Sequence, residues 1–165
     1  MSRLFRNVPI VYSRASARPQ GRPRANTLKV WDLTSGATLR TLEGHTGSVK
    51  AVVLTPDERR AISASADCSL KVWDIESGLL LHSLNGHTRS VDTVALTQDG
   101  RLAVSGSADH NLKVWELNTA KLIASFRADG PLTACALTPH PVTVIAGDTL
   151  GRVHFLRLEG QIAAV

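Results

Sequence analysis

The sequence has few of the residues and patterns that mark metal, redox, secreted or membrane proteins. Its two cysteines, Cys68 and Cys135, are too few and too far apart for a zinc site. So low a cysteine content favours a reducing compartment, and we therefore expect a cytoplasmic protein. No apolar run approaches the length of a membrane-spanning helix, and no signal-peptide core precedes a cleavage motif, so we expect no membrane partner.

Histidine is too scattered to build a ligand site. His82, His110, His140 and His154 have neither metal-ligand spacing nor clustered carboxylates around them, so we expect surface or strand positions, no metal and no cofactor. The sequence also has no phosphate-binding loop of the form Gly-x-x-x-x-Gly-Lys-Ser/Thr. This absence excludes a P-loop nucleotide switch within the chain itself.

What the sequence does contain is a repeat. Trp31, Trp73 and Trp115 stand 42 residues apart. At the same spacing, Gly-His-Thr recurs at 44–46 and 86–88, and Ser-Ala-Asp recurs at 65–67 and 107–109. A fixed period in this range predicts a solenoid or a propeller.

Each unit holds four short apolar runs separated by Gly, Asp, Asn and Ser. Runs of this length and punctuation predict antiparallel strands joined by tight turns, and nothing in the repeat predicts a helix. The thirteen expected strands are residues 28–33, 38–42, 49–54, 61–65, 70–75, 79–84, 91–96, 102–107, 112–117, 121–126, 132–137, 143–146 and 152–158.

The Gly-His, Ser-Ala-Asp and Val-Trp-Asp signatures at these spacings resemble the WD-repeat (WD40) family. The resemblance covers residues 26 to 158 and implies four-stranded sheets arranged as the blades of a β-propeller. We therefore expect an all-β fold in which residues 26–165 form a WD40 repeat domain. Thirteen strands make an incomplete propeller of about three to three and a half blades, whereas a seven-bladed ring needs about twenty-eight strands.

Ser, His and Asp recur together in the repeat and could be read as a catalytic triad, with Ser63 as the nucleophile, His45 as its base and Asp67 as the orienting carboxylate. The resemblance implies a structural relay instead, in which Trp73 donates to Ser63, Ser63 to His45, and His45 to Asp67. An active site has little reason to be duplicated, so we favour the relay and expect no enzyme. The second set of relay residues is His87, Ser105, Asp109 and Trp115.

The last unit departs from this pattern. Ala128-Asp129-Gly130 stands where Gly-His-Thr is expected, and Ala146, Leu150 and Leu156 occupy the relay positions of Ser, Asp and Trp. Atypical terminal units are expected of repeat arrays. The run AGDTLGRVHFLRLE, residues 146–159, resembles the closing unit of WD-repeat tails in bacterial signal-transducing NTPases of the apoptosome-like (NACHT/NB-ARC) class. That resemblance implies the sensor region of a larger signalling protein.

The net charge of +5 is concentrated at one end of the chain. Residues 1–24 contain six arginines and no acid, whereas the remainder has 13 basic and 14 acidic residues. The repeats are therefore nearly neutral and imply no basic face for phosphates. Residues 1–25 do not fit the repeat, and 13–25 have too little apolar surface to bury, so we expect a disordered basic segment.

Three interpretations of residues 1–25 remain open. The segment resembles an organellar transit peptide, although Pro9, Pro19 and Pro23 interrupt any amphipathic helix. It could also be a flexible arm that binds nucleic acid or anionic lipid. Third, Ala25 occupies the slot of Asp67 and Asp109, so an out-of-frame or misplaced start upstream of a longer gene would produce this junction.

These observations predict a non-catalytic protein-interaction scaffold. A basic-arm nucleic-acid binder and a truncated gene product without independent function are the alternatives. Loops on a rigid sheet scaffold are where binding usually occurs, so the candidate partner contacts lie in two equivalent turns: Asp57, Arg59, Arg60, Asp99 and Arg101. An unclosed arc also leaves apolar faces in water, which predicts self-association or a partner that completes the ring.

Overall fold

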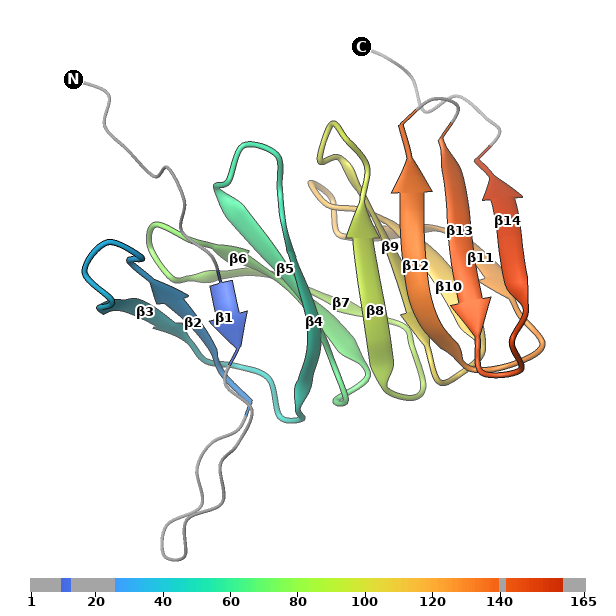
Figure 1. Ribbon diagram of the computed structural model, residues 1–165, viewed down its shortest axis with the longest axis horizontal. Helices are drawn as coiled ribbons and strands as arrows, with labels where there is room; N and C mark the ends of the chain where they lie inside the picture. The colour runs from blue at the N-terminus through green and yellow to red at the C-terminus, as the bar shows by residue number, and fades with distance from the viewer. Residues whose placement is uncertain (1–9, 13–25, 140–141, 159–165) are drawn as a thin grey trace, which may run out of the picture.

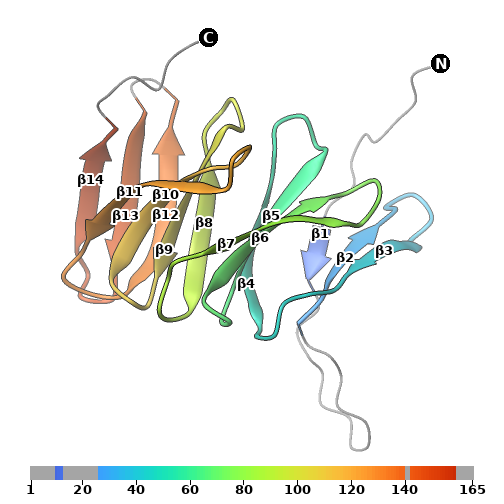
Figure 2. The same ribbon diagram turned by 180° about the vertical axis from the view of Figure 1, so that it is seen from behind.

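The structure, a computed structural model, describes residues 10–12, 26–139 and 142–158. These residues form fourteen strands in four antiparallel sheets that stand side by side along an arc (Figures 1 and 2). No helix long and apolar enough to cross a membrane occurs in the described part of the chain. The strands are β1 Ile10–Tyr12, β2 Leu28–Trp31, β3 Thr38–Leu42, β4 Val49–Leu54, β5 Arg60–Ser65, β6 Ser69–Asp74, β7 Leu80–Asn85, β8 Val91–Leu96, β9 Leu102–Ser107, β10 Asn111–Glu116, β11 Lys121–Arg127, β12 Leu132–Thr138, β13 Thr143–Asp148 and β14 Val153–Arg157.

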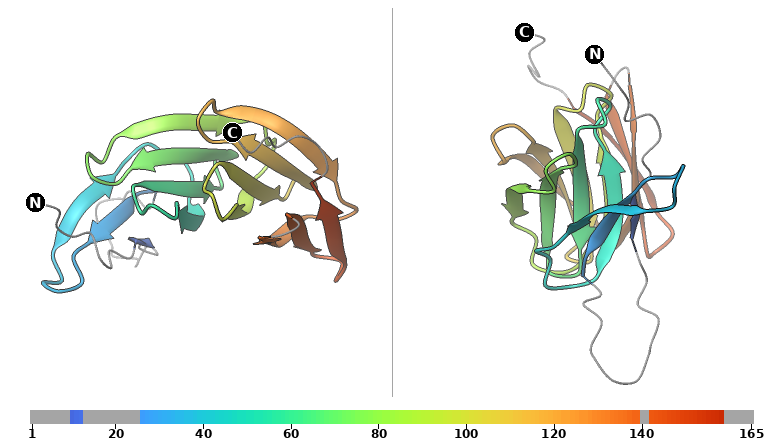
Figure 3. Two further views of the ribbon diagram at one scale, coloured as in Figure 1. Left: turned by 90° about the horizontal axis from the view of Figure 1, so that it is seen from above. Right: turned by 90° about the vertical axis from the view of Figure 1, so that its left-hand side faces the viewer.

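Chain order and spatial order coincide within every sheet. The first sheet is β1-β2-β3, the second β4-β5-β6-β7, the third β8-β9-β10-β11 and the last β12-β13-β14. In the view from above, β4, β8 and β12 line the concave side of the arc, and β3, β7 and β11 form its convex side (Figure 3). The prediction of thirteen strands from residue 28 onward is confirmed, with ends that differ by at most two residues.

The core lies between the sheets, because each sheet packs one face against the sheet before it and the other face against the sheet after it. Alternating side chains of β5 illustrate this: Ala61 packs against the first sheet, whereas Ile62 packs against the third. Both are fully buried, and buried residues make up most of β5, β6 and β9 and half of β10. The middle strands are therefore the best protected part of each sheet, while β3, β7 and β11 are largely exposed.

One strand was not expected. β1 pairs antiparallel with β2, with Ile10 opposite Val30 and Tyr12 opposite Leu28. The prediction of disorder over residues 1–25 is therefore wrong for Ile10–Tyr12, and its remaining residues lie outside the described part of the chain. The reason is that β2 has an inner edge whose backbone N–H and C=O groups need partners, and a short β-branched and aromatic run can supply them.

Candidate functional site

The candidate triad residues of the second sheet meet in one chain of hydrogen bonds. His45 Nδ1 lies 2.7 Å from Asp67 Oδ2, and His45 Nε2 lies 2.7 Å from Ser63 Oγ. The indole Nε1 of Trp73 donates to the same Ser63 hydroxyl at 2.8 Å. Because the carboxylate can only accept, Nδ1 carries the imidazole proton, and Ser63 then donates to Nε2.

Two strands and two loops position these groups. His45 lies in the connection from β3 to β4, Ser63 in the middle of β5, Asp67 in the turn from β5 to β6, and Trp73 near the end of β6. Gly44 lets the indole approach, because a Cβ at this position would lie 3.2 Å from the Trp73 ring. The chain of hydrogen bonds therefore ties two loops at one edge of the sheet to its two middle strands.

The third sheet repeats this geometry. His87 lies 2.8 Å from both Asp109 Oδ2 and Ser105 Oγ, and Trp115 Nε1 donates to Ser105 at 2.9 Å. Gly86 stands beside the Trp115 ring as Gly44 stands beside Trp73. The structure thus brings together all eight residues named from the sequence, as two separate sets of four.

The electrostatics of both sets favour a neutral imidazole. Burial lowers the pKa of His45 and of His87 below the usual value, although the neighbouring carboxylates act in the opposite direction. Burial would raise the pKa of Asp67, but hydrogen bonds from Ser69, His45 and the Thr46 amide outweigh it and lower this pKa to about 2. The pKa of Asp109 is also lowered to about 2, against burial, by the Thr88 and Asn111 amides and by His87.

This geometry has little capacity for nucleophilic catalysis. Ser63 and Ser105 are fully buried, so a substrate carbonyl has no path to either hydroxyl oxygen. Each hydroxyl is also held by a tryptophan N–H, which withdraws electron density from the oxygen that would attack. What the arrangement does supply is a hydrogen-bond partner for each of its own buried side chains.

The first sheet holds the tryptophan of a third set but not its partners. Nε1 of Trp31 is a buried side-chain nitrogen without a hydrogen-bond partner among the described residues. In the second sheet the relay residue Ser63 pairs in register with Lys71. Lys29 is the counterpart of Lys71 in the first sheet, and it pairs with Val11 of β1. A valine therefore stands in the register position of the serine acceptor.

Comparisons with known proteins agree with this geometry. Residues 36–74 match the family described as WD domain, G-beta repeat, and residues 87–158 match the family described as TEP-1 C-terminal beta-propeller. A segment of 44 residues, 27% of this chain, is 46% identical to nuclear distribution protein PAC1 of Arthroderma benhamiae and to that of Trichophyton verrucosum. The four sheets therefore have the fold of WD40 propeller blades. The match spans only 10% of the length of either relative.

The last WD40 blade replaces the relay with a different polar pair. Asp148 Oδ2 lies 3.0 Å from His154 Nε2, and Oδ1 accepts hydrogen bonds from the amides of Leu150 and Arg152. Burial opposes ionisation of Asp148, but His154 and these amides lower the pKa of its carboxyl. The sequence predicts no partner for His154, because the repeat offers no template for this pair.

The candidate partner contacts occupy the turns from β4 to β5 and from β8 to β9. Asp57 and Asp99 shape these turns, since each accepts from a threonine hydroxyl, at 2.5 Å and 2.6 Å, and from an amide two residues on. Arg60 Nη1 donates to Asn118 Oδ1 of the next blade at 3.1 Å, which makes it a contact between blades. The side chain of Arg59 is exposed on the same turn as Asp57.

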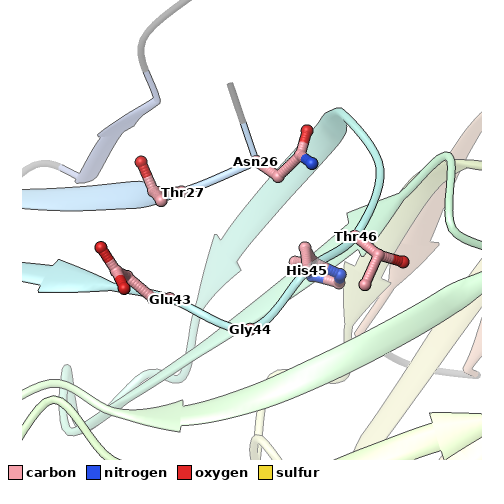
Figure 4. A pocket seen from close by; sticks show the side chains of 6 residues that line it. All are labelled: Asn26, Thr27, Glu43, Gly44, His45 and Thr46. Carbon is pink, nitrogen blue, oxygen red and sulfur yellow. The ribbon is translucent and has the colours of Figure 1, made fainter. Parts of the chain in front are cut away.

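The remaining features of the WD40 blades offer no ligand set. A pocket of about 570 Å³ opens beside the first blade and is lined by Asn26, Thr27, Glu43, Gly44, His45 and Thr46 (Figure 4). Its one imidazole is already bonded to Ser63 and Asp67. No group of three or more metal-binding side chains occurs within the described ranges. Burial raises the pKa of the Cys135 thiol, which makes that cysteine a poor nucleophile.

Proposed function

We propose that this chain is a non-catalytic scaffold for protein–protein interaction. The proposal rests on one observation: the side chains of both Ser-His-Asp-Trp sets are hydrogen-bonded to one another inside the blades. The exposed turns therefore remain as the surface that can contact a partner. Rigid sheets that present exposed turns are suited to binding another protein. We further propose a cytoplasmic protein and, from the tail residues 146–159, the sensor region of a larger bacterial signalling protein.

The binding surface can be tested with charge reversals on opposite faces of the arc. Arg59→Glu combined with Arg101→Glu alters the two equivalent turns, and Arg89→Glu places the same change in the exposed loop before β8 on the other face. Partners are captured with the wild-type chain and each variant under matched conditions. A partner lost only with the Arg59/Arg101 variant supports the proposal. Equal capture by all three proteins would show that these turns are not the binding surface.

A catalytic role has a direct test. Ester hydrolysis is measured for the wild-type chain and for Ser63→Ala and Ser105→Ala. We expect no turnover above background in any of the three. Hydrolysis by the wild-type chain that disappears in either variant would contradict the non-catalytic proposal.

The arginine-rich segment supports a second candidate, binding of nucleic acid. Residues 1–24 carry a charge of +6 from six arginines, and contacts of this kind weaken steeply as salt rises. The candidate predicts salt-dependent binding of a nucleic-acid duplex that is lost on deletion of residues 1–24. Binding that survives the deletion, or no binding at low salt, would exclude it.

A further inference from the structure

The last blade has a face that no described residues cover. In its sheet Ile145 pairs with Phe155, and Gly147 pairs with Val153. The same register joins Ile62 to Val72 and Ala64 to Leu70 in the second blade. These four residues of the second blade are fully buried against the third blade. The last blade therefore presents a surface of the kind that receives the next blade elsewhere in the chain.

The exposure of this surface is large. Phe155 is 69% exposed and Val153 is 58% exposed, whereas their counterparts Val114 and Leu112 in the third blade are 3% and 2% exposed. The contrast has one cause, since Val114 and Leu112 pack against the last blade and no described residues cover Val153 and Phe155. Because burial of apolar surface is favourable, these two large side chains would stabilise contact with a covering partner.

The first blade has the complementary face. Trp31 and Leu33 stand 42 residues before Trp73 and Ile75, and 84 residues before Trp115 and Leu117. In both later blades this tryptophan and this aliphatic residue pack against the preceding blade. Leu33 is 58% exposed, although Leu117 is completely buried. The first blade thus offers the surface that would enter the uncovered face of the last one.

We propose that a second copy of this chain covers these faces, with the first blade of each copy packed on the last blade of the other. The proposal rests on the interaction role proposed above and names one partner for it. The new contact would continue the blade-to-blade interface that the chain already forms three times between its own sheets. Leu33 would then share a core with Val153 and Phe155, as Leu117 shares one with Leu70 and Val72.

Ring size is compatible with two copies. The four sheets of one chain are set along an open arc, and two chains supply eight sheets (Figure 3). Propellers typically have about 4–8 blades, so an eight-sheet ring lies within the known range and a third copy does not fit. A head-to-tail contact that closes in this way gives a discrete dimer, whereas one that fails to close gives open filaments.

The test places an acid on either face at positions that are more than half exposed. Phe155→Asp alters the last blade, Leu33→Asp alters the first, and Leu122→Asp on the convex strand β11 is the matched control, being 45% exposed. Mass is measured by light scattering after size exclusion, over a range of concentrations. Thermal melts and circular dichroism of each variant, compared with Leu122→Asp, show whether it remains folded.

We expect a wild-type particle of twice the 17.7 kDa chain mass. Each end-face variant alone should be monomeric, because an unpaired buried carboxylate weakens such a contact roughly hundredfold or more. A mixture of the Phe155→Asp and Leu33→Asp chains should dimerise again, since one interface then has two wild-type faces. Leu122→Asp should behave as the wild type. Val153→Lys provides a second disruption of the last blade if Phe155→Asp fails to fold.

Several results would overturn the proposal. A wild-type chain that stays monomeric at all concentrations rejects it, and a ladder of larger species shows that the ring does not close. Loss of the dimer in Phe155→Asp but not in Leu33→Asp would indicate a symmetric tail-to-tail contact. Capture of a partner by the exposed turns is measured separately on the monomeric variant, so failure of the dimer and failure of the interaction role are distinguishable.

Discussion

At the scale of single residues, the relay is a solution to burying polar groups. Ser63 is fully buried, and its hydroxyl both accepts from Trp73 and donates to His45. A buried donor or acceptor without a partner costs roughly 1–3 kcal/mol, so each member protects the next from that penalty. Trp31 shows the alternative within the same molecule, because its buried indole N–H has no partner among the residues that the structure describes.

The two tryptophans allow a matched measurement. Trp73→Phe removes a donor that is bonded to Ser63, so we expect a loss of about 1–2 kcal/mol in the free energy of unfolding. Trp31→Phe removes a buried donor that is bonded to none of the described residues, and we expect a change near zero or a small gain. Urea titrations of both variants test this. Equal losses would show that ring packing, rather than the hydrogen bond, determines the effect.

The relay also predicts how stability depends on pH. The pKa of His45 and of His87 is lower in the folded chain than in the unfolded chain, so the unfolded chain binds protons first as pH falls below about 6.5. Below about pH 4 the unfolded aspartates protonate as well, while Asp67 and Asp109 stay ionised down to about 2. Both effects remove stability on acidification.

We therefore expect the midpoint of thermal unfolding to fall from pH 7.5 to 5 and to fall further below pH 4. His45→Gln combined with His87→Gln should flatten the first of these two declines, compared with the wild-type chain in the same buffers. A midpoint that is constant between pH 7.5 and 5 would contradict the lowered histidine pKa values.

At the scale of elements, the turns differ in how well their residues suit their backbone. In the turn from β8 to β9, Gly100 has a φ of 68°, and its counterpart 42 residues earlier, Glu58, has a φ of 58°. A left-handed conformation costs an L-residue about 1–2 kcal/mol, but glycine adopts it freely. The turn from β4 to β5 is therefore held by its hydrogen bonds, including that from Thr55 to Asp57.

Glu58→Gly should consequently raise the free energy of unfolding by about 0.5–1 kcal/mol, since relief of strain exceeds the added entropy of the unfolded chain. Glu58→Ala is the control, because it removes the same exposed carboxylate and keeps the unfavourable φ. Equilibrium denaturation of both variants measures the two changes in the free energy of unfolding. If alanine stabilises as much as glycine, the gain comes from removing the charge.

At the scale of the whole molecule, the same register position has different consequences along the arc. Leu70 in the second blade and Val153 in the last blade occupy equivalent places, yet the first is fully buried and the second is 58% exposed. Repeat arrays are stabilised by contacts between neighbouring units, so the contribution of a side chain to the free energy of unfolding depends on whether a neighbouring blade is present.

Leu70→Ala should therefore cost about 2–4 kcal/mol, and Val153→Ala should change the free energy of unfolding by less than about 0.5 kcal/mol in the monomer. Both are measured by chemical denaturation at a chain concentration where only monomer is present. The Val153→Ala loss should grow with concentration if the end faces are covered by a second copy. A large loss for Val153→Ala in the monomer would contradict the exposure of the last blade.

The sequence by itself determined the repeat, its strands and the members of the relay. The recurrent spacing singled out Trp73, Ser63, His45 and Asp67, the resemblance to WD repeats implied how they pair, and strand ends followed from turn residues such as Gly78 and Gly100. Only the tertiary structure showed the strand Ile10–Tyr12, the pair of Asp148 with His154 and the contact of Arg60 with Asn118. A repeat reveals what neighbouring units share, because equal environments select equal residues. Residue pairs at the ends of the arc and between blades do not recur along the sequence, so the repeat cannot reveal them. They depend on which surfaces are left without a neighbouring blade when the sheets pack.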